Sequence, residues 1–130
     1  MPIDFNISVL VVDDFPQMRR IMMNLLRKIG FKRFTEAENG IVAITKLKLH
    51  SENDKFGLVI MDWNMPKMNG IEVVQAMKAS SKLKDIPILM VTAEAKLENI
   101  KEAAKVGVNK FLVKPFTEEQ LLAKITELFP

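Results

Sequence analysis

The chain has 130 residues, of which 48% are hydrophobic, and it carries a formal net charge of +3 with no cysteine. This composition excludes disulfides and thiolate metal sites. The uninterrupted apolar runs are only about four or five residues long, far shorter than the roughly 20 residues that span a bilayer. The N-terminus lacks a signal-peptide pattern and the lysines form no dense basic stripe, so we expect a cytoplasmic protein that neither inserts into a membrane nor binds nucleic acid. We also expect it to be a monomer.

Short β-branched runs alternate with longer segments of helical periodicity along the whole chain. This alternation is typical of an α/β protein whose parallel sheet is covered on both faces. Strands are predicted at 8–13, 34–37, 58–62, 88–92 and 110–113, and helices at 16–29, 40–49, 70–80, 97–106 and 117–128. These units fit a doubly wound sheet in a single domain, residues 1–130, because an eight-unit barrel needs nearly twice this length.

Several residues mark the ends of the predicted helices. Pro16 suits the first turn of the first helix, and Gly30 suits its C-terminal cap. Gly107 is placed to end the fourth helix. Thr117 with Gln120 three residues later is a capping-box pattern, which predicts the start of the fifth helix.

Five polar residues stand at the ends of four predicted strands, namely Asp13, Asp14, Asp62, Thr92 and Lys114. In doubly wound sheets this edge is where ligands bind. Carboxylate oxygens are the ligands that Mg²⁺ prefers, and a carboxylate can also accept a phosphoryl group. We therefore expect a magnesium site with Asp62 as the nucleophile, and with Thr92 and Lys114 drawn to the new phosphoryl oxygens.

Each of these residues alone has an ordinary structural explanation. An aspartate after a strand usually caps a helix or forms a turn, so it is the whole set at one sheet edge that indicates function. Phosphatases of the haloacid dehalogenase type also place an aspartate after a parallel strand, but they need a second acid two residues later, where this chain has Asn64. A phospho-acceptor explains the pattern better than such an enzyme.

Several motifs resemble those of response-regulator receiver domains, in particular those of the chemotaxis type. They are Val11-Val12-Asp13-Asp14-Phe15, Met18-Arg19-Arg20-Ile21, Asp62-Trp63-Asn64-Met65-Pro66, Val91-Thr92-Ala93-Glu94-Ala95-Lys96 and Lys114-Pro115-Phe116. The resemblance covers nearly the whole chain. It implies a flavodoxin-like fold with strand order 2-1-3-4-5, and a cis peptide bond between Lys114 and Pro115.

The resemblance also implies a function and a site. Asp62 would accept a phosphoryl group from a histidine kinase of the chemotaxis type, and the domain would assist its own phosphorylation and dephosphorylation without being an enzyme. The implied ligands of Mg²⁺ are Asp13, Asp14, Asp62 and the backbone carbonyl of Asn64. Thr92 and Lys114 would be the switch residues, and Asn64 and Glu94 would tune the rate of phosphoryl hydrolysis.

No further module follows the last predicted helix, so we expect output through binding by the domain itself. The implied output face comprises Ala95, Lys96, Phe111, Val113 and Lys124. The implied partner is a flagellar motor switch protein, and a dedicated phosphatase is a further candidate. Phe111 stands where the chemotaxis regulator has a tyrosine, and the chain contains no tyrosine. The alternative function is therefore a receiver that serves as a phosphate sink or acts in a pathway unrelated to the motor.

Overall fold

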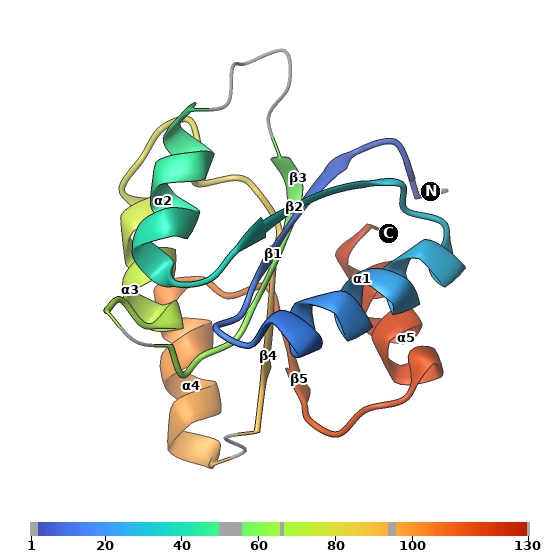
Figure 1. The fold of residues 1–130 in the computed structure, drawn as a ribbon. Helices are drawn as coiled ribbons and strands as arrows, with labels where there is room; N and C mark the ends of the chain where they lie inside the picture. Colours follow the sequence, from blue (N-terminus) through green and yellow to red (C-terminus); the bar gives the residue numbers. More distant parts are fainter. Residues whose placement is uncertain (1–2, 50–55, 66, 94–95, 130) are drawn as a thin grey trace.

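The computed structural model describes residues 3–49, 56–65, 67–93 and 96–129, in which strands and helices alternate (Figure 1). The elements are β1 (Ser8–Val12), α1 (Pro16–Ile29), β2 (Arg33–Ala37), α2 (Gly40–Leu49), β3 (Phe56–Met61), α3 (Gly70–Lys78), β4 (Ile88–Thr92), α4 (Leu97–Val106), β5 (Lys110–Val113) and α5 (Glu118–Leu128). Every predicted element is found, with limits that agree to about two residues. Helix α3 ends earlier than predicted, because the amide of Ser80 donates to the carbonyl of Met77, three residues back, and the α-helical hydrogen-bond pattern stops there.

The strands form one parallel sheet in the order β2-β1-β3-β4-β5, which confirms the doubly wound, flavodoxin-like fold. The central strands β1, β3 and β4 are buried along almost their whole length, which explains their continuous apolar sequences. The edge strands β2 and β5 are more exposed. Because all strands run in one direction, their carboxyl ends meet at one edge of the sheet.

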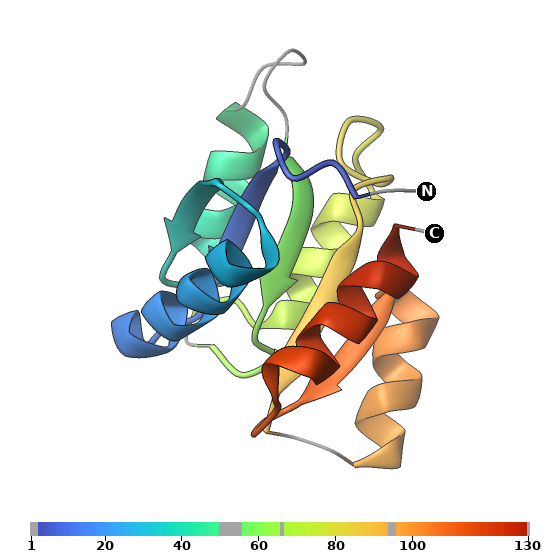
Figure 2. The ribbon, with the colours of Figure 1, turned by 90° about the vertical axis from the view of Figure 1, so that its right-hand side faces the viewer.

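Helices cover both faces of the sheet, with α1 and α5 on one face and α2, α3 and α4 on the other (Figures 1 and 2). Alternate residues of each strand therefore enter two separate cores. On β1, Val9 and Val11 pack in the core under α1 and α5, whereas Leu10 and Val12 pack in the core under the other helices. Burying one such side chain contributes about 1.5–3 kcal/mol, so the two cores fix the strand register and the positions of the strand ends.

The helix limits follow from local signals in the sequence. Pro16 is the first residue of α1, and Gly30 at its C-terminal cap has a φ of 139°. Gly107 ends α4 in the left-handed conformation, with a φ of 108°. The capping box of Thr117 and Gln120 is present at the start of α5. In the part of the chain that the structure describes, no helix combines the length and the apolar character needed to cross a membrane.

Candidate functional site

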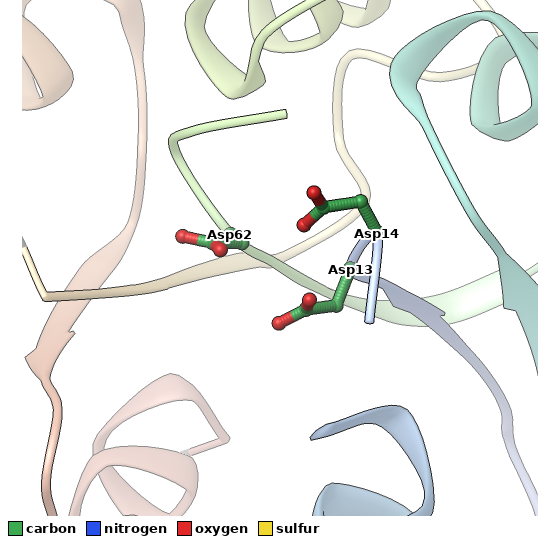
Figure 3. Close-up of side chains that lie close together, drawn as sticks. All are labelled: Asp13, Asp14 and Asp62. Atoms are coloured by element: carbon green, nitrogen blue, oxygen red, sulfur yellow. The ribbon is translucent and has the colours of Figure 1, made fainter. Parts of the chain in front are cut away.

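Three carboxylates gather at the carboxyl ends of β1 and β3 (Figure 3). Asp13 and Asp14 follow β1, and Asp62 follows β3, its neighbour in the sheet. One carboxylate oxygen of each residue lies within 4.8 Å of those of the other two. The backbone amide of Asp62 donates to the carbonyl of Val12 at 3.0 Å, which fixes the two strand ends against each other. We call Asp13, Asp14 and Asp62 the carboxylate cluster.

Lys114 brings a positive charge to this cluster from the end of β5. Its Nζ lies 3.1 Å from Oδ2 of Asp13 and 3.5 Å from Oδ2 of Asp62. The Lys114 side chain is 19% exposed and those of the two aspartates 9% and 11%, so water screens these ion pairs poorly. The backbone amide of Lys114 also donates to the carbonyl of Thr92 at 2.9 Å, which joins the ends of β4 and β5. The peptide bond between Lys114 and Pro115 is cis, as the resemblance implied.

Burial raises the pKa of Asp62 above its ordinary value of 3.8. Loss of hydration is the largest cause, because the small pocket beside the carboxyl group is bordered by the apolar side chains of Met18, Met22, Ile60 and Val91. Lys114 acts in the opposite direction and lowers the pKa, whereas Asp13 raises it. Hydrogen bonds from the backbone amides of Asn64 and Trp63 also lower it. The fold therefore holds the ionised form of Asp62 at a net cost in free energy.

In the metal-free protein, Asp62→Asn is expected to raise the unfolding temperature at pH 7. Because the pKa of Asp62 is raised in the folded state, its protonated form favours folding. This contribution to the free energy of unfolding is fully present below pH 3.8, the ordinary pKa, and is lost as the pH rises through the folded-state pKa. Asparagine carries no charge, so the gain should be largest at neutral pH and should vanish near pH 3.5. Thermal unfolding in EDTA at both pH values measures it.

The exposed Asp85 provides a matched control for this measurement. Asp85→Asn removes the same charge at the surface, and we expect it to leave the unfolding temperature nearly unchanged at both pH values. A gain for Asp62→Asn that persists undiminished at pH 3.5 would contradict the linkage to its ionisation.

Asp14 has the features of a cation ligand. Its Oδ1 is buried and has no hydrogen-bond partner among the described residues. A buried carboxylate oxygen without a partner is unfavourable, and a hard divalent cation would supply the missing interaction. Lys114 neutralises one of the three negative charges of the ionised cluster, and a divalent cation would neutralise the remaining two. The donor set and its charge therefore fit Mg²⁺.

The other predicted site residues lie around the cluster. Thr92 ends β4 at the same sheet edge and is completely buried. Asn64 is exposed in the loop that follows Asp62. The ring of Phe111 on β5 packs edge-on against Trp63, with centroids 6.4 Å apart and an interplanar angle of 68°. The ring at the predicted switch position is thus in contact with the residue next to Asp62.

The expected output residues that the structure describes lie on or directly beside three adjacent elements, α4, β5 and α5 (Figure 2). Lys96 directly precedes α4 and is exposed, and Val113 ends β5 half-buried. Lys124 lies on α5, where its Nζ is 3.7 Å from Oε2 of Glu127. Two further predicted residues lie outside the described part of the chain, Glu94 and Ala95.

Two residues beside the cluster have no role in the sequence-based predictions. Arg19 on α1 donates through Nη1 to the backbone carbonyl of Asp13 at 2.6 Å. Gly70 begins α3, and its Cα lies so close to the carbonyl of Asp62 that a side chain would collide with it. An arginine in the first turn after two candidate metal ligands is a usable signal for Arg19. In the sequence, Gly70 is only the first residue of the helix predicted at 70–80, so its close contact with Asp62 could not be anticipated.

Comparison with known proteins identifies the family. Residues 9–126 match the response regulator receiver domain. The chemotaxis protein CheY of Pseudomonas aeruginosa is 50% identical over 122 residues, which cover 94% of this chain and 95% of that protein. The chemotaxis protein CheY-3 of Vibrio cholerae is 48% identical over 124 residues, covering 95% of this chain and 92% of that protein. The structure of the chemotaxis response regulator CheY4 of Vibrio cholerae superimposes with a TM-score of 0.85 at 35% identity, covering 95% of this chain and 99% of that one. The chain therefore belongs to the response regulator receiver domains, as a phospho-acceptor of the CheY type.

Proposed function

We propose that this chain is a stand-alone response regulator of a two-component chemotaxis system, acting in the cytoplasm as a single receiver domain. A chemotaxis histidine kinase phosphorylates Asp62 in the presence of Mg²⁺, and the phosphorylated form controls flagellar rotation by binding the motor switch. The observation that carries this proposal is the carboxylate cluster, with Lys114 beside Asp13 and Asp62 and an unpartnered buried oxygen on Asp14. The similarity to chemotaxis proteins over most of the chain supports it.

Asp62 is the nucleophile in the proposed transfer. A bond forms between one of its carboxylate oxygens and the phosphorus of the kinase phosphohistidine as the phosphorus–nitrogen bond breaks, and the electron pair of that bond leaves with the imidazole. The ammonium of Lys114 is 3.5 Å from Oδ2 of Asp62, within reach of the charge on the arriving phosphoryl oxygens. The chain contributes mainly by positioning the groups and neutralising their charge.

The residues that would hold Mg²⁺ are Asp13, Asp14, Asp62 and the backbone carbonyl of Asn64. When bound, the ion supplies charge neutralisation between these ligands and the phosphoryl oxygens. The Asp13 carboxylate is already oriented, because its Oδ1 accepts the backbone amide of Phe15 at 2.9 Å and its Oδ2 pairs with Lys114. The buried Oδ1 of Asp14 is free of such partners among the described residues and is therefore available to a cation.

The same site resets the signal. The domain assists its own phosphorylation and dephosphorylation, and Asn64 and Glu94 tune how readily water reaches the phosphoryl group. The exposure of Asn64, close in sequence to Asp62, supports this role, because a side chain there can affect the access of water. A dedicated phosphatase would reach the phosphoryl group from this same exposed side of the site, beside Asn64.

Phosphorylation is transmitted through Thr92 and Lys114 to the ring of Phe111. New phosphoryl oxygens attract the buried hydroxyl of Thr92 and the ammonium of Lys114, which changes the packing at the ends of β4 and β5. The contact of Phe111 with Trp63 couples the switch ring to the residue after Asp62. The proposed output face consists of Ala95, Lys96, Phe111, Val113 and Lys124.

The first test follows the fluorescence of Trp63, the only tryptophan, which adjoins Asp62. We expect saturable quenching during a Mg²⁺ titration, and a further decrease when acetyl phosphate is added, because both events change the charge beside the indole. Asp62→Asn should lack the second decrease, and mass spectrometry should find one phosphoryl group on the wild type alone. The proposal would be overturned if the fluorescence of the wild type did not change with Mg²⁺ and the protein retained no phosphoryl group.

A phosphate sink or a receiver of a non-motor pathway is the second candidate, and Phe111 favours it. Phenylalanine lacks the hydroxyl of the tyrosine that chemotaxis regulators carry at this position. The two candidates differ in partner binding. A motor regulator binds the N-terminal segment of the organism's flagellar switch protein more tightly when phosphorylated, whereas a sink shows no dependence on phosphorylation.

A further inference from the structure

Arg19 connects three elements of the chain next to the carboxylate cluster. Its Nη1 donates to the backbone carbonyl of Asp13 at 2.6 Å, and its Nε donates to Oε1 of Glu36 at 2.9 Å. Arg19 lies on α1, Asp13 follows β1, and Glu36 lies on β2. The Arg19 side chain is only 13% exposed, against 47% for Glu36. A shielded guanidinium with two partners in different directions is fixed in orientation.

Strand β2 supports Asp13 both directly and through Arg19. The backbone amide of Asp13 donates to the carbonyl of Ala37 on β2 at 3.1 Å. Glu36, which precedes Ala37 on the same strand, accepts a hydrogen bond from the guanidinium of Arg19. The backbone of Glu36 is itself held, because its carbonyl accepts a hydrogen bond from Nζ of Lys46 on α2. The amide and the carbonyl of Asp13 are therefore both hydrogen-bonded, one to β2 and the other to α1.

The carbonyl that Arg19 holds belongs to the peptide group between Asp13 and Asp14. Because a peptide group is planar, fixing its carbonyl also fixes the amide of Asp14 and so limits the direction of the Asp14 side chain. The Asp13 carboxylate has its own supports in Phe15 and Lys114. The buried Oδ1 of Asp14 has no hydrogen-bond partner among the described residues, so its placement depends on the backbone.

We propose that Arg19 is a positioning residue for the cation site. It fixes the peptide plane between Asp13 and Asp14, which directs the Asp14 carboxylate toward the cluster, while Glu36 orients Arg19. The inference rests on the proposed function, in which this cluster binds Mg²⁺. Lysine would not replace Arg19 fully, because a single ammonium on a flexible stem lacks the rigid geometry that serves two partners at once.

Charge and positioning predict opposite effects of removing Arg19. A positive charge near a cation site repels the cation, so its loss would strengthen Mg²⁺ binding if charge were its only contribution. Partners that orient metal ligands typically change metal affinity by about 10–100-fold when they are removed. Weaker Mg²⁺ binding by Arg19→Gln would therefore isolate the positioning effect.

The first measurement is the Mg²⁺ dissociation constant from Trp63 fluorescence. We expect Arg19→Gln to weaken binding about tenfold. Arg19→Lys should give an intermediate value, and Glu36→Gln a smaller loss, because it weakens only the contact that orients Arg19. Arg20→Gln removes the same charge from the adjacent exposed residue and should bind Mg²⁺ like the wild type.

The second measurement needs neither Mg²⁺ nor phosphorylation. In the metal-free protein, the amide of Phe15 bonds Oδ1 of Asp13 and reports the local structure, whereas the amide of Val59 bonds the carbonyl of Pro87 in the buried sheet and reports global opening. We expect Arg19→Gln to accelerate hydrogen exchange at Phe15 about tenfold relative to Val59. The ratio separates loosening of this loop from a general loss of stability.

Unchanged or tighter Mg²⁺ binding by Arg19→Gln would overturn the inference, and so would equal acceleration of both amides. Failure of the proposed function gives a different result, because the wild type and Arg20→Gln would then also fail to bind Mg²⁺. In that case the exchange ratio at Phe15 still decides whether Arg19 holds the Asp13 carbonyl.

Discussion

Gly70→Ala is expected to lower the rate of Asp62 phosphorylation by acetyl phosphate about a hundredfold. A Cβ at position 70 would lie 2.7 Å from the backbone carbonyl oxygen of Asp62, 3.1 Å from Cα of Trp63 and 3.1 Å from Sδ of Met90. The Met90 side chain can adjust, but the carbonyl of Asp62 cannot move without moving the proposed nucleophile. A displacement of about 1 Å in a reacting group can reduce a rate by this factor, and overpacking also costs about 1–3 kcal/mol of stability.

Gly57→Ala is the matched control for this prediction. Gly57 lies near the other end of β3, where the atoms nearest to an added Cβ belong to the side chain of Ile7, the closest being its Cβ at 2.7 Å. We expect a comparable loss of stability in urea unfolding, but an unchanged phosphorylation rate per folded molecule. Equal rates for the two variants would show that the contact at Asp62 is not what positions the nucleophile.

The order of elements was predictable from the sequence because burial leaves a clear pattern in it. Strands buried on both faces require unbroken apolar runs, and amphipathic helices require a repeat near 3.6 residues. Pro16, Gly107 and Thr117 then marked helix ends through constraints that act within a few residues. The limit of α3 was less certain because the turn after it depends on Ser80, which carries no strong local signal.

The composition of the site was also predictable, because parallel strands bring their carboxyl ends to one edge. The pairing of β1 with β3 follows from strand order, which the resemblance to a family implied and periodicity did not. The contacts that orient the site are of a different kind. Arg19 on α1 donates hydrogen bonds both to the carbonyl of Asp13 after β1 and to the side chain of Glu36 on β2. Such contacts between separate elements produce no periodic pattern in the sequence.

The state of Asp62 is another property that the sequence alone could not give. A neighbouring lysine lowers the pKa of a carboxyl group, so Lys114 on its own would suggest a lowered value for Asp62. Burial against apolar side chains outweighs it and leaves the pKa raised. The balance depends on how completely the fold removes water from the cluster, which is a property of the packed structure.

Lys114→Met is expected to destabilise the metal-free protein by about 3 kcal/mol at pH 7. Removing one member of a buried ion pair typically costs about 3–5 kcal/mol because the other charge stays buried, and partial exposure of Lys114 places this case at the lower end. Here both Asp13 and Asp62 lose their cation. Saturating Mg²⁺ should restore most of the loss in urea unfolding, because a divalent cation compensates the same charges.

The dependence on pH has a definite sign. Lys114 lowers the pKa of Asp62, so removal of Lys114 raises that pKa further. Stability then falls over a wider pH range, from 3.8 up to the higher folded-state pKa. The loss should therefore shrink as the pH falls from 7 to 4. Lys110→Met is the control, because the Lys110 ammonium pairs with Glu127 at 3.8 Å on the surface, and such a pair contributes about 0–1 kcal/mol. A loss for Lys114→Met that Mg²⁺ does not relieve would mean that the lysine stabilises the fold by packing rather than by its charge.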